Sequence, residues 1–196
     1  MCIRDSHTYV LCGDGDLMEG ISNEASSIAG TLELGKLIVL YDSNNITIEG
    51  DTSLSFKESI ADRYRALGWQ VLTVEDGTDV DAISKAIEEA KAETTKPTII
   101  EVKTVIGFGS PLAGDAGVHG SPLGEEKNLA TKEALGYDVA PFTVSGEVKD
   151  YVDELLTEKK KNYDDWKAIE DRYKETYPEK YKDFIAHYDT KEQDLS

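Results

Sequence analysis

Positively charged residues are scarce in this sequence of 196 residues, which holds 21 lysines and arginines against 39 aspartates and glutamates. The formal net charge of −18 argues against a nucleic-acid-binding protein, because a phosphate backbone requires clustered lysine and arginine. Long apolar runs are also absent, and none approaches the length of about 18 residues that a membrane-spanning helix needs. We therefore expect neither a nucleic-acid partner nor a membrane partner.

Cysteine is equally rare. The sequence contains only Cys2 and Cys12, which do not form a metal-binding motif and are too few for a disulfide framework. No apolar signal-peptide core follows Met1, so the expected location is cytoplasmic. A strand-like run begins at Tyr9 with no preceding element to pack against, and we expect the natural chain to begin upstream of Met1.

Strand-like and helix-like segments alternate through residue 106. This alternation predicts an α/β fold with a parallel β-sheet flanked by helices, and ligands bind such sheets at the carboxyl ends of the strands. Ser22 is the expected cap of the first helix. The expected strands are Tyr9–Cys12, Leu37–Tyr41, Trp69–Val74 and Pro97–Ile106, and the expected helices are Ser22–Leu34, Phe56–Leu67 and Val80–Ala92.

The rest of the chain has a different composition. A glycine-rich loop, Gly107–Gly124, is long enough to indicate a functional loop rather than a simple connection. From about residue 147 the chain is rich in lysine, acidic residues and tyrosine, with apolar residues at helical spacing. We expect a first domain over residues 7–144, incomplete at its N-terminus, and a helical linker or extension over residues 145–196.

The turn in Leu11–Gly20, "LCGDGDLMEG", is open to several interpretations. The dinucleotide-binding fingerprint fails at Met18, where glycine is required, and an EF-hand loop fails at the same residue, where an oxygen ligand is required. A P-loop fails at Ile21, which replaces the essential lysine. A tight turn with incidental acids is the remaining alternative for this stretch taken by itself.

A second stretch, "YDSNNITI" at Tyr41–Ile48, follows the next strand and changes that balance. Asp14 and Asn44 end adjacent parallel strands, so a carboxylate and an amide oxygen meet at one sheet edge, where the Ile46 carbonyl adds a third oxygen. Mg²⁺ prefers such oxygen ligands together with phosphate oxygens. The glycines beside Asp14 let the backbone approach a diphosphate closely. A metal would therefore bridge an acidic turn and an anionic ligand.

Gly-Asp-Gly followed about thirty residues later by Asn-Asn resembles the thiamine-diphosphate-binding motif. The stretches "GDGDLMEGISNEASSIAGTLELGKLIVLYDSNNITIEG", "RYRALGWQV", "KPTIIEVKTVIGFGS" and "VHGSPLG" are similar to the transketolase family over roughly residues 8–142. The resemblance implies thiamine-diphosphate- and Mg²⁺-dependent transfer of a two-carbon ketol unit from a ketose phosphate to an aldose phosphate, in the pentose phosphate pathway. It implies sugar phosphates as substrates and a homodimer.

The resemblance also implies roles for individual residues. Asp14 and Asn44 would ligate Mg²⁺ through their side chains and Ile46 through its carbonyl, with Ca²⁺ or another divalent ion able to substitute. His119 would contact the diphosphate and act near the reacting carbon of the substrate, whereas a plain loop residue is its alternative. The expected cofactor-binding residues are Gly13, Gly15, Asn44, Ile48 and His119.

Five other polar residues also receive an interpretation. Glu19 and Glu24 match acids that family members use near the subunit interface, although acids are also favoured at a helix N-terminus by the helix dipole. His7 and His187 are interpreted as surface residues. Asp16 adds a carboxylate beside the expected metal turn and would oppose a diphosphate unless its side chain points away.

The resemblance implies that the remaining transketolase domains lie outside this chain, so we expect the isolated chain to be inactive. Another thiamine enzyme, such as deoxyxylulose-phosphate synthase or dihydroxyacetone synthase, is one alternative. The sequence around Glu24 and the loop of His119 disfavour deoxyxylulose-phosphate synthase. A truncated, non-catalytic interaction subunit is the alternative from a different class. Asp14, Asn44 and His119 disfavour it, because a purely structural role does not require them together.

Overall fold

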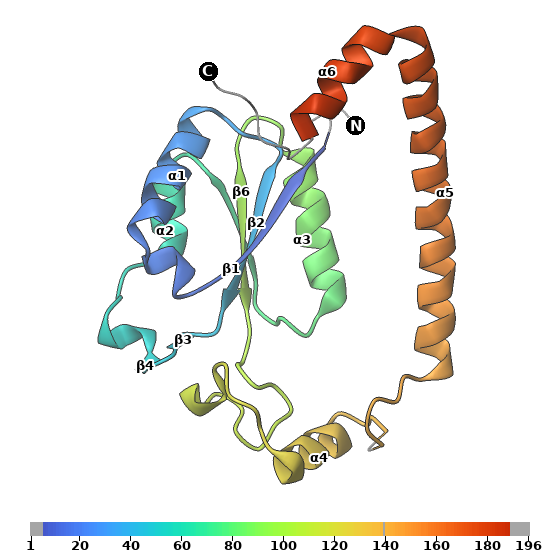
Figure 1. Cartoon of the computed structure of the whole chain (residues 1–196). Helices are drawn as coiled ribbons and strands as arrows, with labels where there is room; N and C mark the ends of the chain where they lie inside the picture. Colours follow the sequence, from blue (N-terminus) through green and yellow to red (C-terminus); the bar gives the residue numbers. More distant parts are fainter. Residues whose placement is uncertain (1–5, 139, 189–196) are drawn as a thin grey trace, which may run out of the picture. The chain divides into compact units, whose positions relative to one another are not determined.

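The computed structural model describes residues 6–138 and 140–188 (Figure 1). Residues 1–5, on which the expectation of an upstream start partly rests, lie outside the described residues. The described residues fall into two compact units, 6–138 and 140–188. The first unit carries the sheet and is described first.

The first unit is built on a four-stranded, wholly parallel sheet with strand order β1-β2-β6-β5. In the register of the sheet, Gly13 of β1 is paired with Asp42 of β2, so the carboxyl ends of these two strands lie side by side. This confirms the predicted fold class. The strands are β1 (Thr8–Gly13), β2 (Leu37–Ser43), β5 (Gln70–Val74) and β6 (Thr98–Lys103).

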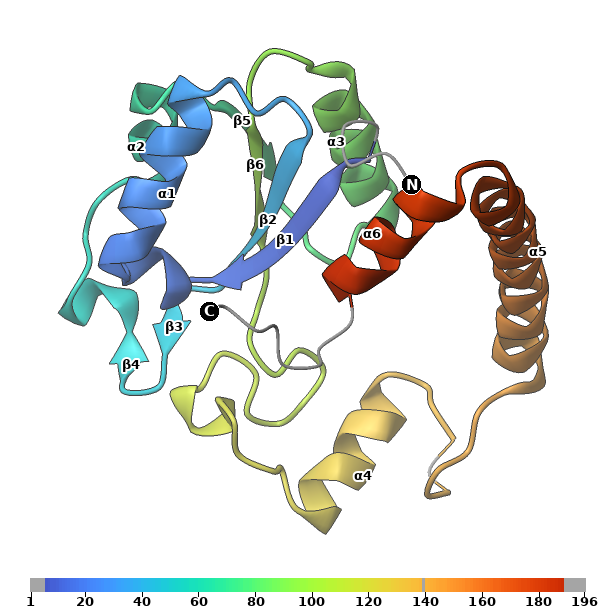
Figure 2. The same cartoon turned by 45° about the horizontal axis from the view of Figure 1, so that its top comes forward.

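Helices cover both faces of this sheet (Figure 2). Helices α1 (Gly20–Thr31) and α2 (Ile60–Ala66) lie on one face, and α3 (Val80–Ala92) lies on the other. The chain runs from β1 through α1 to the neighbouring β2, and from there through α2 to β5 at the far edge of the sheet. Helix α3 then leads back to β6, which lies between β2 and β5. The change of direction moves the helix to the opposite face, because parallel crossovers keep one hand.

The sheet separates the two halves of the hydrophobic core, and β2 contributes side chains to both. Val39 and Tyr41 pack into the cluster under α1 and α2, together with Leu17 and Trp69. Ile38 points to the opposite face and packs with the apolar side of α3. Successive side chains of a strand alternate between faces, so an unbroken apolar run serves both halves of the core, as the sequence predicted for this segment.

Two predicted helix starts are wrong. Helix α1 begins at Gly20 with Glu19 as its N-cap, and the Ser22 hydroxyl instead donates hydrogen bonds to the Leu17 and Glu19 carbonyls. Helix α2 begins four residues later than predicted, because Ser59 accepts a hydrogen bond from the Asp62 amide and caps it there. The 3-10 turn η1 (Asp16–Met18) ends the glycine-acid turn and leads directly into α1.

Close approach between helices explains one glycine inside α1. A β-carbon on Gly30 would lie 1.9 Å from the Leu67 carbonyl oxygen at the end of α2. Only glycine lets the two backbones meet at this point. Helix α2 ends as predicted before Gly68, whose φ of +85° is a left-handed conformation that favours glycine.

The loops at the carboxyl edge contain short elements. After β2 the chain forms a two-stranded ladder, β3 (Ile46–Thr47) with β4 (Gly50–Asp51), and then the turn η2 (Thr52–Leu54). The glycine-rich loop after β6 includes the turn η3 (Ala116–Val118), and α4 (Glu125–Ala134) follows it. These loops supply the polar groups at the edge of the sheet.

The second unit is helical, as the composition predicted. It contains α5 (Gly146–Thr176), 31 residues long, and α6 (Pro178–Tyr188). The Ser145 hydroxyl caps α5 by accepting a hydrogen bond from the Val148 amide. Within residues 6–138 and 140–188, no helix is both long enough and apolar enough to cross a lipid bilayer.

Candidate functional site

A cavity of about 660 Å³ lies at the carboxyl ends of β1 and β2. The β3–β4 ladder and the loop after β6 also contribute to its walls. The structure thus brings together residues from three segments that are distant in the sequence. All seven residues proposed from the sequence line this cavity: Gly13, Asp14, Gly15, Asn44, Ile46, Ile48 and His119.

Asp14 is the buried centre of this edge, with only 7% of its surface exposed. Its Oδ1 accepts a hydrogen bond of 2.6 Å from the Tyr41 hydroxyl. Its Oδ2 accepts hydrogen bonds from the Asn44 amide at 3.2 Å and the Asn45 amide at 3.0 Å. A buried carboxylate needs such donors to offset the loss of water.

The Asn-Asn pair forms the turn that delivers these amides. The Asn44 side-chain Oδ1 accepts a hydrogen bond from the Ile46 amide at 2.9 Å. Asn45 has a φ of +61°, a left-handed conformation that asparagine tolerates better than most residues. Its carbonyl accepts a hydrogen bond from Thr52, which connects the turn to η2. The left-handed backbone at position 45 therefore favours an asparagine there, whether or not a ligand binds.

Neither glycine beside Asp14 is required by the fold. Gly15 has an ordinary φ of −63°, and a β-carbon placed there would meet no atom within 4 Å. A β-carbon on Gly13 would make only ordinary contact, with the Asp16 carboxylate at 3.9 Å. The space beside Gly15 is therefore left open by the protein, as expected where a ligand approaches the backbone.

Negative charge is concentrated at this edge of the sheet. Burial, followed by the neighbouring carboxylates of Asp16, Asp14 and Asp42, raises the pKa of the Cys12 thiol to about 12. Burial, followed by the hydrogen bond to Asp14, raises the pKa of the Tyr41 hydroxyl well above its ordinary value. Both groups therefore remain protonated near neutral pH. An anionic ligand would require a cation at this edge.

The oxygen set fits a hard divalent cation such as Mg²⁺. Asp14 Oδ1 and Asn44 Oδ1 each accept one hydrogen bond, and each has a second acceptor position. The carbonyl of Ile46 lies at the start of β3, directly after this turn. Among the described residues, no cluster of three or more His, Cys, Asp or Glu side chains is arranged to hold a metal. A metal at this edge would thus rely on amide and carbonyl oxygens as well as one carboxylate.

His119 differs from the other two histidines in its position. It follows η3 in the loop after β6 and lines the cavity, with its side chain exposed. His187 is an exposed residue of α6, and His7 directly precedes β1. Glu19, the N-cap of α1, also lines the cavity, whereas Glu24 is exposed on α1.

Asp16 stabilises the Gly-Asp-Gly turn through a hydrogen bond to the turn's own backbone. Its Oδ2 accepts a hydrogen bond of 2.8 Å from the Gly13 amide, so this carboxylate is directed back into its own turn. The bond joins the end of β1 to η1. It also gives the carboxylate a donor, which lowers the electrostatic cost of a second acid beside Asp14.

Sequence reasoning missed two residues that hold the turn in place. Tyr41 was expected to be a core residue of its strand, and no role was expected for Arg63. A hydroxyl on the last aromatic residue of a buried strand, directly before the polar turn, is the signal that indicates Tyr41. No comparable sequence signal indicates Arg63, because its partners lie far away in the chain.

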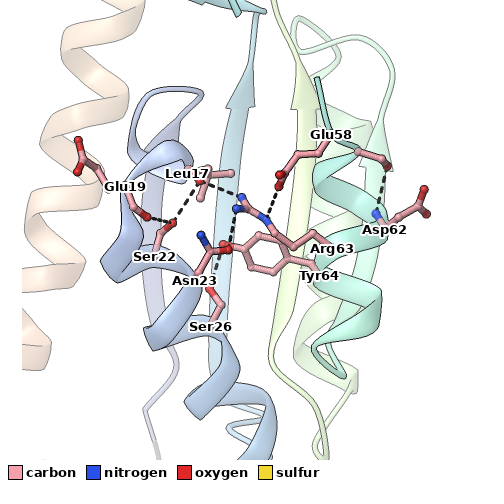
Figure 3. A network of polar contacts seen from close by, with 10 residues as sticks. Leu17, Glu19, Ser22, Asn23, Ser26, Glu58, Asp62, Arg63 and Tyr64 are labelled. Atoms are coloured by element: carbon pink, nitrogen blue, oxygen red, sulfur yellow. Dashed lines mark hydrogen bonds and ion pairs between the residues drawn. The ribbon is translucent and has the colours of Figure 1, made fainter. Parts of the chain in front are cut away.

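Arg63 of α2 joins three segments (Figure 3). Its Nη2 donates a hydrogen bond of 2.9 Å to the Leu17 carbonyl of η1, and its Nη1 donates one of 2.8 Å to Asn23 Oδ1 of α1. Its Nε lies 3.0 Å from Glu58 Oε1 in an ion pair without hydrogen-bond geometry. The guanidinium also lies over the Phe56 ring, 5.4 Å from its centroid.

We expect Arg63→Met to lower the free energy of unfolding by about 2–4 kcal/mol, because it removes charged hydrogen bonds from a side chain that is only 15% exposed. Arg65→Met is the matched control on the same helix. Arg65 pairs with Asp62 at the surface, so its loss should cost no more than about 1 kcal/mol. Urea unfolding of both variants measures the difference. Equal losses would show that the Arg63 network contributes little.

Known proteins provide an independent comparison for this fold and cavity. Residues 1–192 match the family described as "Transketolase, thiamine diphosphate binding domain". The chain is 51% identical over 180 residues to a transketolase of Bacillus subtilis (strain 168), covering 90% of this chain and 27% of that protein. A solved transketolase from Leishmania mexicana has a TM-score of 0.84 at 42% identity, covering 93% of this chain and 28% of the other.

A solved transketolase of Pichia Stipitis in complex with sedoheptulose-7-phosphate has a TM-score of 0.81 at 45% identity. The match covers 89% of this chain and 26% of that chain. The chain therefore spans about a quarter of the length of the relatives it matches. The parallel sheet, the cavity at its carboxyl edge and these matches lead to one conclusion: the chain belongs to the transketolase family, in its thiamine-diphosphate-binding domain.

Proposed function

We propose that this chain supplies the metal- and diphosphate-binding half of the active site of a longer transketolase. The reaction would transfer a two-carbon ketol unit from a ketose phosphate to an aldose phosphate, as a step of the pentose phosphate pathway in the cytoplasm. The observation that carries this proposal is the single cavity lined by all seven residues proposed from the sequence. Similar proteins were solved in complex with fructose-6-phosphate and sedoheptulose-7-phosphate, which supports sugar phosphates as substrates.

The residues of this chain would bind and orient the cofactor. Asp14, Asn44 and the Ile46 carbonyl would hold Mg²⁺, which in turn would hold the diphosphate against the open backbone at Gly15. Bound thiamine diphosphate supplies the carbon nucleophile of the reaction. His119, placed on the same cavity, would contact the diphosphate and exchange protons with the substrate.

Exposed apolar surface supports a longer, dimeric protein. Leu11 on β1, an edge strand of the sheet, is 82% exposed. Ile21 and Ile28 on α1, and Leu32 at its C-cap, are all more than half exposed. Apolar residues gathered on an edge strand and one helix favour burial against further protein. We propose that other transketolase domains and a second subunit cover them, and that the isolated chain transfers no ketol units.

A glycine substitution tests the proposed ligand. Gly15→Ala is expected to weaken thiamine diphosphate binding about tenfold to hundredfold, because the methyl group would fill the space that the protein leaves open. The melting temperature should remain nearly unchanged. Isothermal calorimetry with Mg²⁺ and thiamine diphosphate, on the natural protein that carries this chain, measures the affinity.

Gly20→Ala provides the matched control. A β-carbon on Gly20 also meets no atom within 4 Å, but this residue begins α1 and does not line the cavity. Its variant should bind the cofactor like the wild type. Equal binding by the Gly15 and Gly20 variants would contradict the proposed diphosphate position.

Assays with formaldehyde as acceptor would separate dihydroxyacetone synthase activity from transketolase activity.

A further inference from the structure

The Asp14 carboxylate is held by donors that all come from one segment, the end of β2 and the turn after it. These donors are the Tyr41 hydroxyl and the amides of Asn44 and Asn45. The two amides both donate to Oδ2, and Tyr41 donates to Oδ1. A carboxylate oxygen accepts about two hydrogen bonds, so Oδ2 is fully used and Oδ1 has one acceptor position left.

The remaining acceptor position identifies the oxygen of Asp14 that is available to a metal. Oδ1 is that oxygen, and the Tyr41 hydroxyl already occupies its other position at 2.6 Å. Rotation of the carboxylate would break this short bond and both amide bonds together. The direction of the free position on Oδ1 is therefore set by Tyr41 together with the Asn-Asn turn.

Asp14 lines two cavities of different size. One is the cavity of about 660 Å³ that Asn44 and His119 also line. The other is a polar cavity of about 150 Å³, which Tyr41, Glu58 and Glu101 also line. Two acids in the smaller cavity make it unfavourable for a third carboxylate. The Tyr41 hydroxyl is the donor that Asp14 Oδ1 has beside these two acids.

Tyr41 is well placed to hold this geometry. Only 4% of its surface is exposed, and its ring packs in the core between the sheet and helices α1 and α2. The ring is therefore anchored by the tertiary structure, and its hydroxyl has little freedom to follow a displaced carboxylate. An outer partner of this kind commonly changes metal affinity by a factor of about 10–100.

We propose that Tyr41 is a positioning residue for the metal, which orients Asp14 so that Oδ1 offers its free acceptor position to a divalent cation. This inference rests on the proposed function, because it requires that Asp14 ligates Mg²⁺. It adds a residue whose effect acts through Asp14 and not through contact with cofactor or substrate.

The chain offers a matched control. Tyr64 of α2 belongs to the same core cluster as Tyr41 and is 3% exposed. Its hydroxyl also has a side-chain partner, because it accepts a hydrogen bond of 3.0 Å from Ser26 Oγ. No hydrogen bond between described residues joins the Tyr64 side chain to the Gly-Asp-Gly turn. Tyr64→Phe therefore reproduces the loss of a buried hydroxyl and its hydrogen bond without changing the proposed metal ligand.

The experiment compares Tyr41→Phe, Tyr64→Phe and the wild type in the natural, assembled protein that carries this chain. Calorimetric titration with MgCl₂ at a fixed thiamine diphosphate concentration gives the Mg²⁺ concentration at half-saturation. Tyr41→Phe is expected to raise that concentration about tenfold or more, and excess Mg²⁺ should restore cofactor binding. Tyr64→Phe should leave it unchanged within about twofold, although this variant also loses a buried hydrogen bond and should lower the melting temperature.

The outcomes separate this inference from the proposed function. If the wild type shows no Mg²⁺-dependent binding, the proposed function fails and the inference fails with it. If the wild type binds but Tyr41→Phe has the wild-type midpoint, or shifts only as much as Tyr64→Phe, the inference alone is overturned. A crystal structure of the wild type with Mg²⁺ gives a second test that needs no variant. Metal ligation through Oδ1, with the Tyr41 hydroxyl still bonded, supports the inference, and ligation through Oδ2 overturns it.

Discussion

Asp14→Asn is expected to abolish Mg²⁺-dependent thiamine diphosphate binding at physiological concentrations, with an affinity loss of at least about 100-fold. Outer partners of a metal ligand already contribute about 10–100-fold to affinity, and loss of the ligand itself should cost more. The substitution also places an NH₂ group where the structure requires an acceptor for Tyr41 or for two backbone amides. Calorimetry of the natural protein that carries this chain, with a melting curve for each variant, measures both effects.

Asp42→Asn is the control for the loss of charge alone. Asp42 lies at the end of β2, next to Gly13 in the register, and its exposed side chain is hydrogen-bonded to Thr104. Its neutralisation removes one negative charge from the same edge of the sheet. We expect less than about a threefold change in Mg²⁺ affinity, because exposed charges interact weakly. Similar losses in the two variants would show that net charge, and not ligation by Asp14, governs binding.

His119→Ala is expected to lower kcat about 100-fold or more at saturating Mg²⁺ and thiamine diphosphate. A positioned acid-base group commonly contributes a factor of about 100–10,000 to the rate, and His119 is the only histidine that lines the cavity among the described residues. The exposed side chain belongs to a loop, so the melting temperature should change little. Steady-state kinetics of ketol transfer between sugar phosphates measures kcat in the natural protein.

His187→Ala serves as the control for this variant. His187 is exposed on α6, and no catalytic role is proposed for it. Its variant should retain the wild-type kcat. A His119 variant with kcat within about twofold of the wild type would leave this residue as an ordinary part of the loop.

Periodicity in the sequence was sufficient for the elements whose stability depends on burial. The apolar spacing of residues 80–92 gave the bounds of α3 correctly, since Ala86 and Ala90 bury one continuous face against the sheet. The unbroken apolar run of β2 was recognised for a similar reason. In each element, the apolar residues recur at the spacing that places their side chains on the buried face or faces. The local sequence is therefore sufficient to predict the element.

Helix starts were predicted less well because they depend on individual hydrogen bonds. Ser22 was expected to cap α1, yet its hydroxyl bonds back to the Leu17 and Glu19 carbonyls of the preceding turn. The segment before Ser59 was expected to be helical, yet its Phe56 ring and Glu58 carboxylate instead contact the Arg63 guanidinium. These hydrogen-bond and ring partners meet because α1 and α2 pack against each other. The apolar periodicity of the sequence does not predict how those two helices pack.

The sequence by itself determined which polar groups lie at this edge of the sheet. Gly-Asp-Gly and Asn-Asn after two successive apolar strands place a carboxylate and an amide oxygen at one sheet edge, because parallel strands must end on the same side. Only the tertiary structure decided how Asp14 is oriented. The hydroxyl of Tyr41 and the anchoring of η1 by Arg63 come from residues 27 and 46 positions away from their partners in the chain. Such contacts form only when the core is packed, since packing alone selects which distant side chains meet.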